Sequence, residues 1–166
     1  MSLPWFRREN RLIFPVVRVD DRLLHGQVVV GWGQTLGIAP LLLVSDRVVK
    51  DEELSLTFRQ LIPAEQRGEV IAVSDAAERW VRGEFKKARA MLVIETPVDA
   101  LKMVRLGVPM KVLTLGGLHF REGREEFLPY VFLSGWDSTT LQELRTLGVR
   151  IQCQDLPTSK PILYGE

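Results

Sequence analysis

Hydrophobic residues gather along the chain in short runs that alternate with segments of helical period. Seven of these runs are short and nearly continuous in apolar residues, which is typical of parallel strands covered on both faces. The predicted strands are Val16–Val19, Pro40–Ser45, Glu69–Val73, Ala90–Glu95, Lys111–Leu115, Tyr130–Leu133 and Val149–Gln152. Alternation of strands with helices predicts an α/β fold with an open, mostly parallel sheet.

The segments between these strands carry helical patterns with recognisable starts and stops. The first helix is predicted from the shared face of Val28, Val29, Trp32 and Leu36, and Gly37 can end it. Further helices are predicted at Asp51–Leu61, from a cap at Ser74 onward, from Thr96–Pro97 to Gly107, and at Asp137–Leu147.

Two segments depart from this alternation. The glycine-rich stretch Gly116–Gly123 forms a long loop where a helix would otherwise stand between two strands. The tail "PTSKPILYGE" is interrupted by prolines and is expected to pack irregularly along the surface.

Composition adds limits rather than a function. The 166 residues, 46% hydrophobic and 26% charged, suit one soluble globular domain. A net charge of +1 gives no indication of nucleic acid or an anionic membrane as partner, and no apolar run approaches the roughly 20 residues of a membrane helix. The single Cys153 excludes an internal disulfide and a cysteine metal cluster, and we expect it to be a buried thiol in a reducing cytoplasm.

The stretch "RVDDRLLHGQVVVGW" places charged residues and a histidine directly after the first predicted strand. Ligands of open α/β sheets bind beyond the carboxyl ends of the strands, near a topological switch point. If Val16–Val19 is a central strand, the residues from Asp20 to His25 occupy that position. The sequence therefore predicts a functional site there.

An anion on His25 would find suitable partners in the following residues. The helix begins at Gly26, so backbone N–H groups near Gln27 and Val28 lack helical acceptors and face an anion with the positive helix end. A neutral imidazole nitrogen can attack phosphorus and hold a phosphoryl group. Arg22 can meet the charge of that group with a forked set of N–H donors.

The acidic residues leave two chemistries open. Asp20 or Asp21 could hold Arg22, or could fix the tautomer of the imidazole. The same carboxylates, with His25 and His119, could instead bind a metal in a hydrolase, although the arginine among them argues against this. Simpler readings are a histidine at a helix start and an ion pair in a loop.

At this point the motifs resemble a known family. "VRVDDRLLHGQVVVGW" resembles the phosphohistidine motif of the mannose/fructose/sorbose-type IIB proteins of the bacterial phosphotransferase system (PTS). "GGLHFREG" resembles the second loop of that family, and "VPMKVLTLGG" and "QDLPTSKP" resemble family patterns in the same order. The resemblance covers Val16 to Pro161.

This resemblance implies a single α/β domain with a mainly parallel seven-stranded sheet and helices on both faces. It implies a cytoplasmic phosphocarrier enzyme that needs no cofactor or metal and is held at the inner face of the membrane by a permease. The carrier takes phosphoryl from a phosphohistidine on a IIA domain and gives it to a sugar moving through the IIC and IID components. His25 matches the phosphorylated histidine, with Nδ1 as the attachment point.

The second loop and Arg18 have two readings each. His119 is either a loop histidine bonded to backbone or a participant in the chemistry, and Arg18 makes either a structural salt bridge or a site contact. The glycines permit positive φ angles or let backbone approach a phosphate, and the surface around both loops is the expected docking face for IIA. The second-loop site residues are Gly116, Gly117, His119, Phe120 and Arg121.

Three function classes follow from these observations: a phosphocarrier enzyme, a regulatory module sensitive to phosphorylation, and a metal-dependent hydrolase. Residues 1–14 are expected to be an extension whose first residues fit a vector remnant, and residues 15–166 to be the IIB domain. The stretch from Ser45 to Glu69 keeps only a loose likeness to the family. The sugar and self-association are left open.

Overall fold

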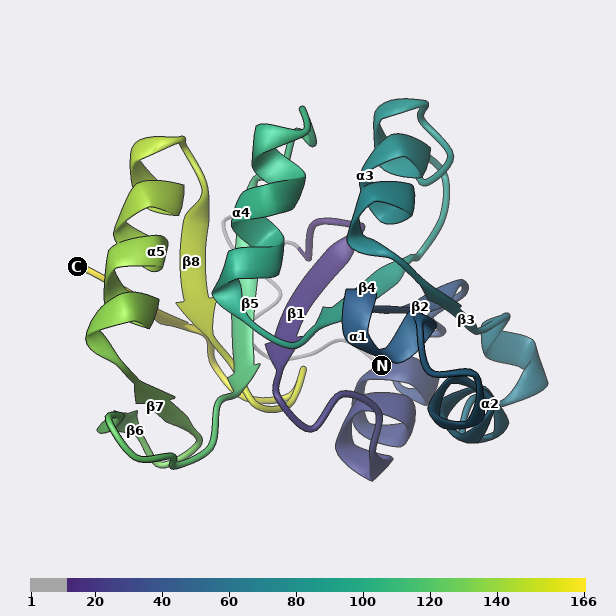
Figure 1. Cartoon of the computed structure of the whole chain (residues 1–166), viewed down its shortest axis with the longest axis horizontal. Helices are drawn as coiled ribbons and strands as arrows, with labels where there is room; N and C mark the ends of the chain where they lie inside the picture. Colours follow the sequence, from purple (N-terminus) through teal and green to yellow (C-terminus); the bar gives the residue numbers. More distant parts are fainter. Residues whose placement is uncertain (1–11) are drawn as a thin grey trace.

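A seven-stranded sheet forms the centre of the protein, which a computed structural model describes over residues 12–166 (Figure 1). Most of the predicted extension, residues 1–11, lies outside the described residues. The strand order is β3-β2-β4-β1-β5-β8-β9, and every neighbouring pair is parallel except β8 and β9. The strands are β1 (Val16–Asp20), β2 (Leu41–Val44), β3 (Glu69–Ile71), β4 (Met91–Ile94), β5 (Val112–Gly117), β8 (Arg150–Cys153) and β9 (Ile162–Leu163). The predicted fold class is confirmed.

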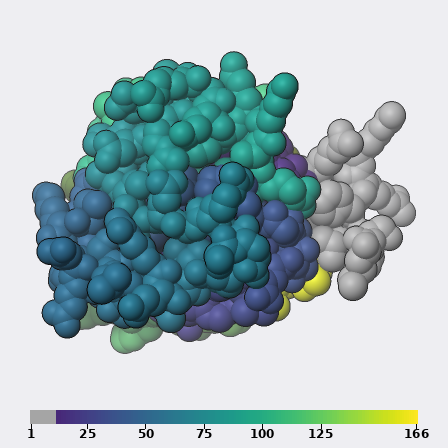
Figure 2. All heavy atoms as spheres, turned by 90° about the vertical axis from the view of Figure 1, so that its right-hand side faces the viewer, coloured from purple at the N-terminus to yellow at the C-terminus, as the bar shows by residue number. Residues whose placement is uncertain are grey.

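Helices cover both faces of this sheet. On one face lie α3 (Val73–Val81), α4 (Pro97–Arg105) and α5 (Gly135–Thr146), which stand in a row in Figure 1. On the other face lie the π-helix η2 (Gln27–Gln34), α1 (Asp46–Val49) and α2 (Glu52–Gln60), and a short 3₁₀ turn, η3 (Ala64–Gln66), precedes β3. Figure 2 shows the β3 edge, where the blue and teal segments around α2 and α3 form the surface. Within residues 12–166, no helix is both long and apolar enough to span a membrane.

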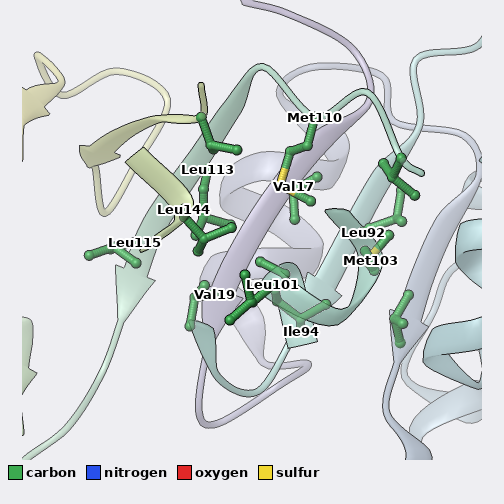
Figure 3. Packing of buried hydrophobic residues seen from close by; sticks show 14 of the residues in the cluster. Val17, Val19, Leu92, Ile94, Leu101, Met103, Met110, Leu113, Leu115 and Leu144 are labelled. Carbon is green, nitrogen blue, oxygen red and sulfur yellow. The ribbon is translucent and has the colours of Figure 1, made fainter. Parts of the chain in front are cut away.

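The larger core lies between the sheet and the row α3, α4 and α5. Side chains of the central strands, including Val17, Leu92 and Leu113, meet Leu101 of α4 and Leu144 of α5 there (Figure 3). Full burial of an aliphatic side chain of this size contributes about 1.5–3 kcal/mol, so this face supplies much of the stability. Cys153 belongs to the same core, and burial raises the pKa of its thiol to about 12, as expected of a structural thiol.

Alternation along β1 gives its two faces different chemistry. Val17 and Val19 face the larger core, whereas Val16 joins the core beneath η2. The charged side chains of Arg18 and Asp20 alternate with the valines and are fully buried. The central strand therefore carries a buried ion pair toward its carboxyl end.

The connections around β1 diverge at its carboxyl end. The chain leaves β1 through η2 toward β2 on one side, and it crosses from β4 through α4 to β5 on the other side. Such a divergence is the switch point at which open α/β sheets bind ligands. The condition for the predicted site, a central first strand, is therefore met.

One predicted strand lies outside the main sheet. Tyr130–Leu133 appears as β7 (Val131–Leu133), which pairs in an antiparallel hairpin with β6 (Glu125–Leu128). The seventh strand of the main sheet is β9 in the tail, where an irregular path was predicted. Two residues are too few to show a strand period, and only pairing with β8 defines this edge strand.

Two helix starts also differ from the prediction. Helix α3 begins at Val73 rather than after a cap at Ser74, because the Asp46 carboxylate accepts the Val73 N–H at 2.9 Å and replaces a local cap. Helix α5 begins at Gly135, and Ser134 and Asp137 form a capping box around its first turn.

Candidate functional site

A tight turn links β1 to η2 and presents His25. The Leu23 N–H donates to the Asp20 carbonyl at 3.0 Å, and Leu23 adopts a φ of 61°, a left-handed conformation that costs energy in a leucine. Leu23 and the following Leu24 are buried beneath η2. Their burial holds the strained turn in place and fixes where His25 emerges.

Asp20 orients the ring of His25. Nε2 of His25 lies 2.8 Å from Oδ2 of Asp20, whose side chain is fully buried, while 22% of the His25 side chain is exposed. Burial raises the pKa of Asp20, but the hydrogen bond from His25 and the charge of Arg18 outweigh it, so the pKa lies below its usual value. An ionised carboxylate only accepts, so a neutral ring has its proton on Nε2 and its lone pair on Nδ1.

Arg18 supports this carboxylate from within the fold. Its Nη2 donates to Oδ2 of Asp20 at 3.1 Å, and its Nη1 donates to the carbonyls of Gln154 and Asp155 at 3.1 and 2.9 Å. The guanidinium carbon lies 5.3 Å from the ring centre of Trp32. Burial lowers the pKa of Arg18, and the charge of Asp20 opposes this effect. Arg18 therefore makes a buried salt bridge, and the carboxylate in that bridge is the one that orients His25.

The two glycines at the end of β5 make room for this ion pair. A Cβ on Gly116 would lie 2.0 Å from the Arg18 guanidinium carbon, and one on Gly117 would lie 3.2 Å from the Asp20 carboxylate. Neither glycine has a positive φ. The prediction that they permit positive φ is wrong, because their value lies in the missing side chain.

Arg22 and the start of η2 lie beside His25. The Arg22 N–H donates to Oδ1 of Asp20 at 3.0 Å, but its Nε is 4.0 Å from that oxygen and 52% of its side chain is exposed. The side chain is thus free to contact a group on His25. The N–H of Val28 donates to the His25 carbonyl at 3.0 Å, so the prediction of a free donor there is wrong. The backbone N–H groups of Gly26 and Gln27 precede that of Val28 at the start of the helix.

A second aspartate–histidine pair stands next to the first. Nδ1 of His119 lies 2.6 Å from Oδ1 of Asp21, and the His119 N–H donates to Oδ2 at 2.9 Å. The His119 side chain is 40% exposed. Burial raises the pKa of Asp21, but its hydrogen bonds with His119 and Arg124 bring it below the usual value. The His119 ring is hydrogen-bonded to the Asp21 carboxylate, so the interpretation of His119 as a loop histidine bonded to backbone is wrong.

Arg124 completes this second pair and was not among the predicted site residues. Its Nη1 donates to Oδ2 of Asp21 at 3.1 Å and to the His119 carbonyl at 2.9 Å, and its Nε lies 3.4 Å from Asp137 at the start of α5. In the sequence it stands in a charged run that resembles solvated surface. Its contacts with Asp21 and its side-chain exposure of only 9% show that Arg124 instead supports the Asp21–His119 pair.

The remaining residues of the second loop separate into buried and exposed positions. Leu118 is fully buried and contributes no surface for docking. Phe120 is 70% exposed, with its ring centre 5.9 Å from that of Phe132. Arg121 is 65% exposed, and its Nη2 lies 3.9 Å from Asp21.

The charges around the carboxylates do not favour a cation. Within residues 12–166, no three histidine, cysteine, aspartate or glutamate side chains are grouped as metal ligands. Asp20 and Asp21 each contact an arginine. Each carboxylate also binds one nitrogen of its own histidine, so the two histidines do not share a carboxylate. Arginine neighbours supply the positive charge that a metal would otherwise bring.

Comparisons of the sequence with known proteins all point to the same family. The family described as "PTS system sorbose subfamily IIB component" matches residues 14–162. The N-acetylgalactosamine-specific phosphotransferase enzyme IIB component 1 of Escherichia coli (strain K12) is 33% identical over 86% of this chain and 90% of its own length. The fructose-specific EIIB component of Bacillus subtilis (strain 168) is 27% identical over 86% of this chain and 88% of its own length.

Solved structures agree with this family. The IIBSor domain of the sorbose permease from Klebsiella pneumoniae superposes with a TM-score of 0.80 at 27% identity, covering 89% of this chain and 90% of that one. The chain also matches 46% of the mannose-specific EIIAB component of Escherichia coli (strain K12), at 25% identity over 89% of this chain.

The fold and site define an α/β domain with an oriented histidine at the carboxyl end of its central strand. Because the family match spans most of the sequence, the chain belongs to the sorbose subfamily of PTS IIB components. It is a component of PTS sugar uptake, and IIB components are phosphotransferase domains of sugar phosphorylation.

Proposed function

We propose that this IIB component carries a phosphoryl group on Nδ1 of His25, taking it from a phosphohistidine on IIA and giving it to a sugar. The observation that carries the proposal is the 2.8 Å contact of Nε2 with Asp20. Because this contact places the proton of the neutral ring on Nε2, the lone pair on Nδ1 is free to attack phosphorus.

In the first step, the Nδ1 lone pair attacks the phosphorus of phospho-IIA while the bond from phosphorus to the donor nitrogen breaks. The ring of His25 gains positive charge during this step, and the ionised Asp20 stabilises it. We propose that Arg22, whose side chain is half exposed, and the N–H groups of Gly26 and Gln27 at the helix start meet the phosphoryl oxygens. In the second step a sugar hydroxyl attacks phosphorus and the bond to Nδ1 breaks.

IIA docks on the surface around Asp20–Gly26 and the second loop, because the two histidines must come within a few ångströms of each other. The exposed side chains of Phe120 and Arg121 support a share for the second loop, whereas Leu118 is buried and takes no part. The mannose-specific EIIAB relative, in which this chain matches about half of the length, supports partnership with a IIA domain. Contact with a membrane IIC/IID permease would hold the protein at the cytoplasmic face.

Residues 15–166 are proposed to form the IIB domain, supported by the family match over residues 14–162. Relatives are named for sorbose, fructose, mannose and N-acetylgalactosamine, which supports a sugar as the final acceptor.

Labelling tests the assignment of His25. Phosphoenolpyruvate, the general PTS proteins and a matching IIA should phosphorylate the wild type, with an adduct labile in acid and stable in alkali. His25→Ala should take up no label, while His119→Ala, the matched control in the only other histidine, should be labelled like the wild type. Equal labelling of His25→Ala would refute the proposal.

A further inference from the structure

We propose that His119, oriented by Asp21, is the general base that removes the proton from the sugar hydroxyl as that hydroxyl attacks phosphohistidine. This inference rests on the proposed function and adds a second catalytic residue to the same site. It concerns only the second transfer, from His25 to the sugar.

The hydrogen bonds of His119 leave one nitrogen ready to accept a proton. Asp21 binds Nδ1 of the ring at 2.6 Å and also accepts the His119 N–H at 2.9 Å. Since the carboxylate accepts at Nδ1, a neutral ring carries its proton there and keeps its lone pair on Nε2. With 40% of the His119 side chain exposed, a substrate hydroxyl can reach the ring.

The position of His119 follows from its partner. Asp20 and Asp21 are consecutive residues, so the carboxylates that hold the two rings extend from Cα atoms about 3.8 Å apart. The Asp21 N–H donates to the Gly117 carbonyl at 2.9 Å, which joins the β1 turn to the second loop. Both rings are therefore held at the carboxyl ends of the adjacent strands β1 and β5.

The two transfers differ in their proton balance. When phosphoryl moves from one histidine to another, a nitrogen–phosphorus bond replaces another and no hydroxyl proton is released. When a sugar attacks, an oxygen–phosphorus bond forms, the bond to Nδ1 of His25 breaks with its electron pair returning to that nitrogen, and the hydroxyl proton must be accepted. Nε2 of His119 accepts it, whereas Asp20 is already occupied by His25 and Arg18.

The charged groups around His119 favour this role. Asp21 stabilises the protonated ring, and Arg124 fixes Asp21 through Oδ2 while its Nε reaches Asp137. Arg121 extends to within 3.9 Å of Asp21 from the exposed side. A carboxylate held in this way is a stable orienting group for a histidine base.

The test separates the two half-reactions in His119→Ala and His119→Gln, with Glu122→Ala, an exposed neighbour in the same loop, as the matched control. Acceptance of phosphoryl from phospho-IIA is followed by rapid quench. Transfer of phosphoryl from His25 to sugar is measured by mixing the phosphorylated protein with membranes that contain the IIC/IID permease and with the sugar that the wild type phosphorylates. Sorbose, fructose, mannose and N-acetylgalactosamine are the sugars used.

We expect the His119 variants to accept phosphoryl within about threefold of the wild-type rate and to transfer it to sugar about a hundredfold or more slower. Added imidazole should partly rescue the sugar step of His119→Ala, and the pH profile of that step should differ between the wild type and the His119 variants. Two results would overturn the role of His119 as general base. One is an equal loss of rate in both transfers without rescue by imidazole, and the other is an unchanged rate of transfer to sugar. A wild type that never carries phosphoryl on His25 would instead refute the proposed function, and the base role with it.

Discussion

Two adjacent aspartates hold two histidines in opposite ways. Asp20 binds Nε2 of His25 and is fully buried, whereas Asp21 binds Nδ1 of His119 and keeps 5% of its side chain exposed. The partner arginine of the first pair, Arg18, comes from the central strand, and that of the second comes from a loop. The first pair is thus part of the core and the second belongs to the rim.

The two pairs suit one turn to two tasks. A carboxylate that is buried with an arginine keeps a fixed direction, which suits the orientation of a nucleophilic nitrogen. A more exposed ring can meet a substrate from outside. We call Asp20–His25 the inner pair and Asp21–His119 the outer pair. Substitution of the inner pair should affect both folding and phosphoryl acceptance, whereas substitution of the outer pair should leave acceptance largely intact.

The largest effect is expected for Asp20→Asn. The amide loses the charge that supports His25 and leaves the Arg18 guanidinium buried without its counter-charge. We expect a loss of about 3–5 kcal/mol of stability and a fall of about two to four orders of magnitude in transfer from phospho-IIA. Urea unfolding and rapid quench measure the two effects.

Asp21→Asn is the matched control for this change. It should cost only about 1–3 kcal/mol in stability and leave acceptance within a few-fold of the wild type. Equal effects of the two substitutions would mean that the inner and outer pairs do not differ as described.

Arg22→Lys should give the next largest effect, on rate alone. Lysine keeps the charge but loses the planar fork that can meet two phosphoryl oxygens. Loss of about 1.5–3 kcal/mol in the transition state corresponds to a roughly ten- to hundredfold slower acceptance. Because half of the Arg22 side chain is exposed, the unfolding midpoint should hardly change, and an unchanged rate would assign Arg22 to structure.

A methyl group added beneath the inner pair should have a smaller effect. In Gly116→Ala the new Cβ would collide with the Arg18 guanidinium, and the shift needed to relieve it costs about 1–3 kcal/mol. Gly135→Ala, at the first position of α5 with open space around its Cβ, should cost nothing measurable. Thermal unfolding of both variants tests this, and similar melting temperatures would contradict the close packing of Arg18.

The smallest effect is expected from acid. The pKa values of Asp20 and Asp21 are lowered in the folded state, so their contribution to stability is present above the unfolded value of about 3.9 and is lost as pH falls through the folded values. The urea midpoint should therefore fall below about pH 4. Asp20→Asn should show a shallower dependence, and an unchanged slope would indicate that Asp20 is not ionised in the folded protein.

The parts of the fold with strong local signals could be predicted from sequence. Short runs rich in apolar residues predict β1 to β5, and Thr96–Pro97 specifies the start of α4. Contacts made by distant segments left no such signal. The Asp46 carboxylate replaces a local cap at α3, and β9 exists only because β8 pairs with it.

The site divides in the same manner. The motif around His25 stands in one continuous stretch, and its position after the first strand could be inferred directly. The role of Gly116 depends on Arg18, almost one hundred positions earlier, and the role of Arg124 depends on Asp21 and Asp137 together. Such roles follow from packing between strands, which one sequence does not display.

In the proposed function, the phosphoryl group resides on Nδ1 of His25 while Nε2 remains hydrogen-bonded to Asp20. Nitrogen-15 and phosphorus-31 NMR of protein phosphorylated through IIA measures this directly, since coupling identifies the nitrogen that carries phosphorus. We predict a single phosphohistidine at His25, with phosphorus coupled to Nδ1 and a proton retained on Nε2. Phosphorus coupled to Nε2 of His25, or found on His119, would refute this assignment of the phosphoryl group.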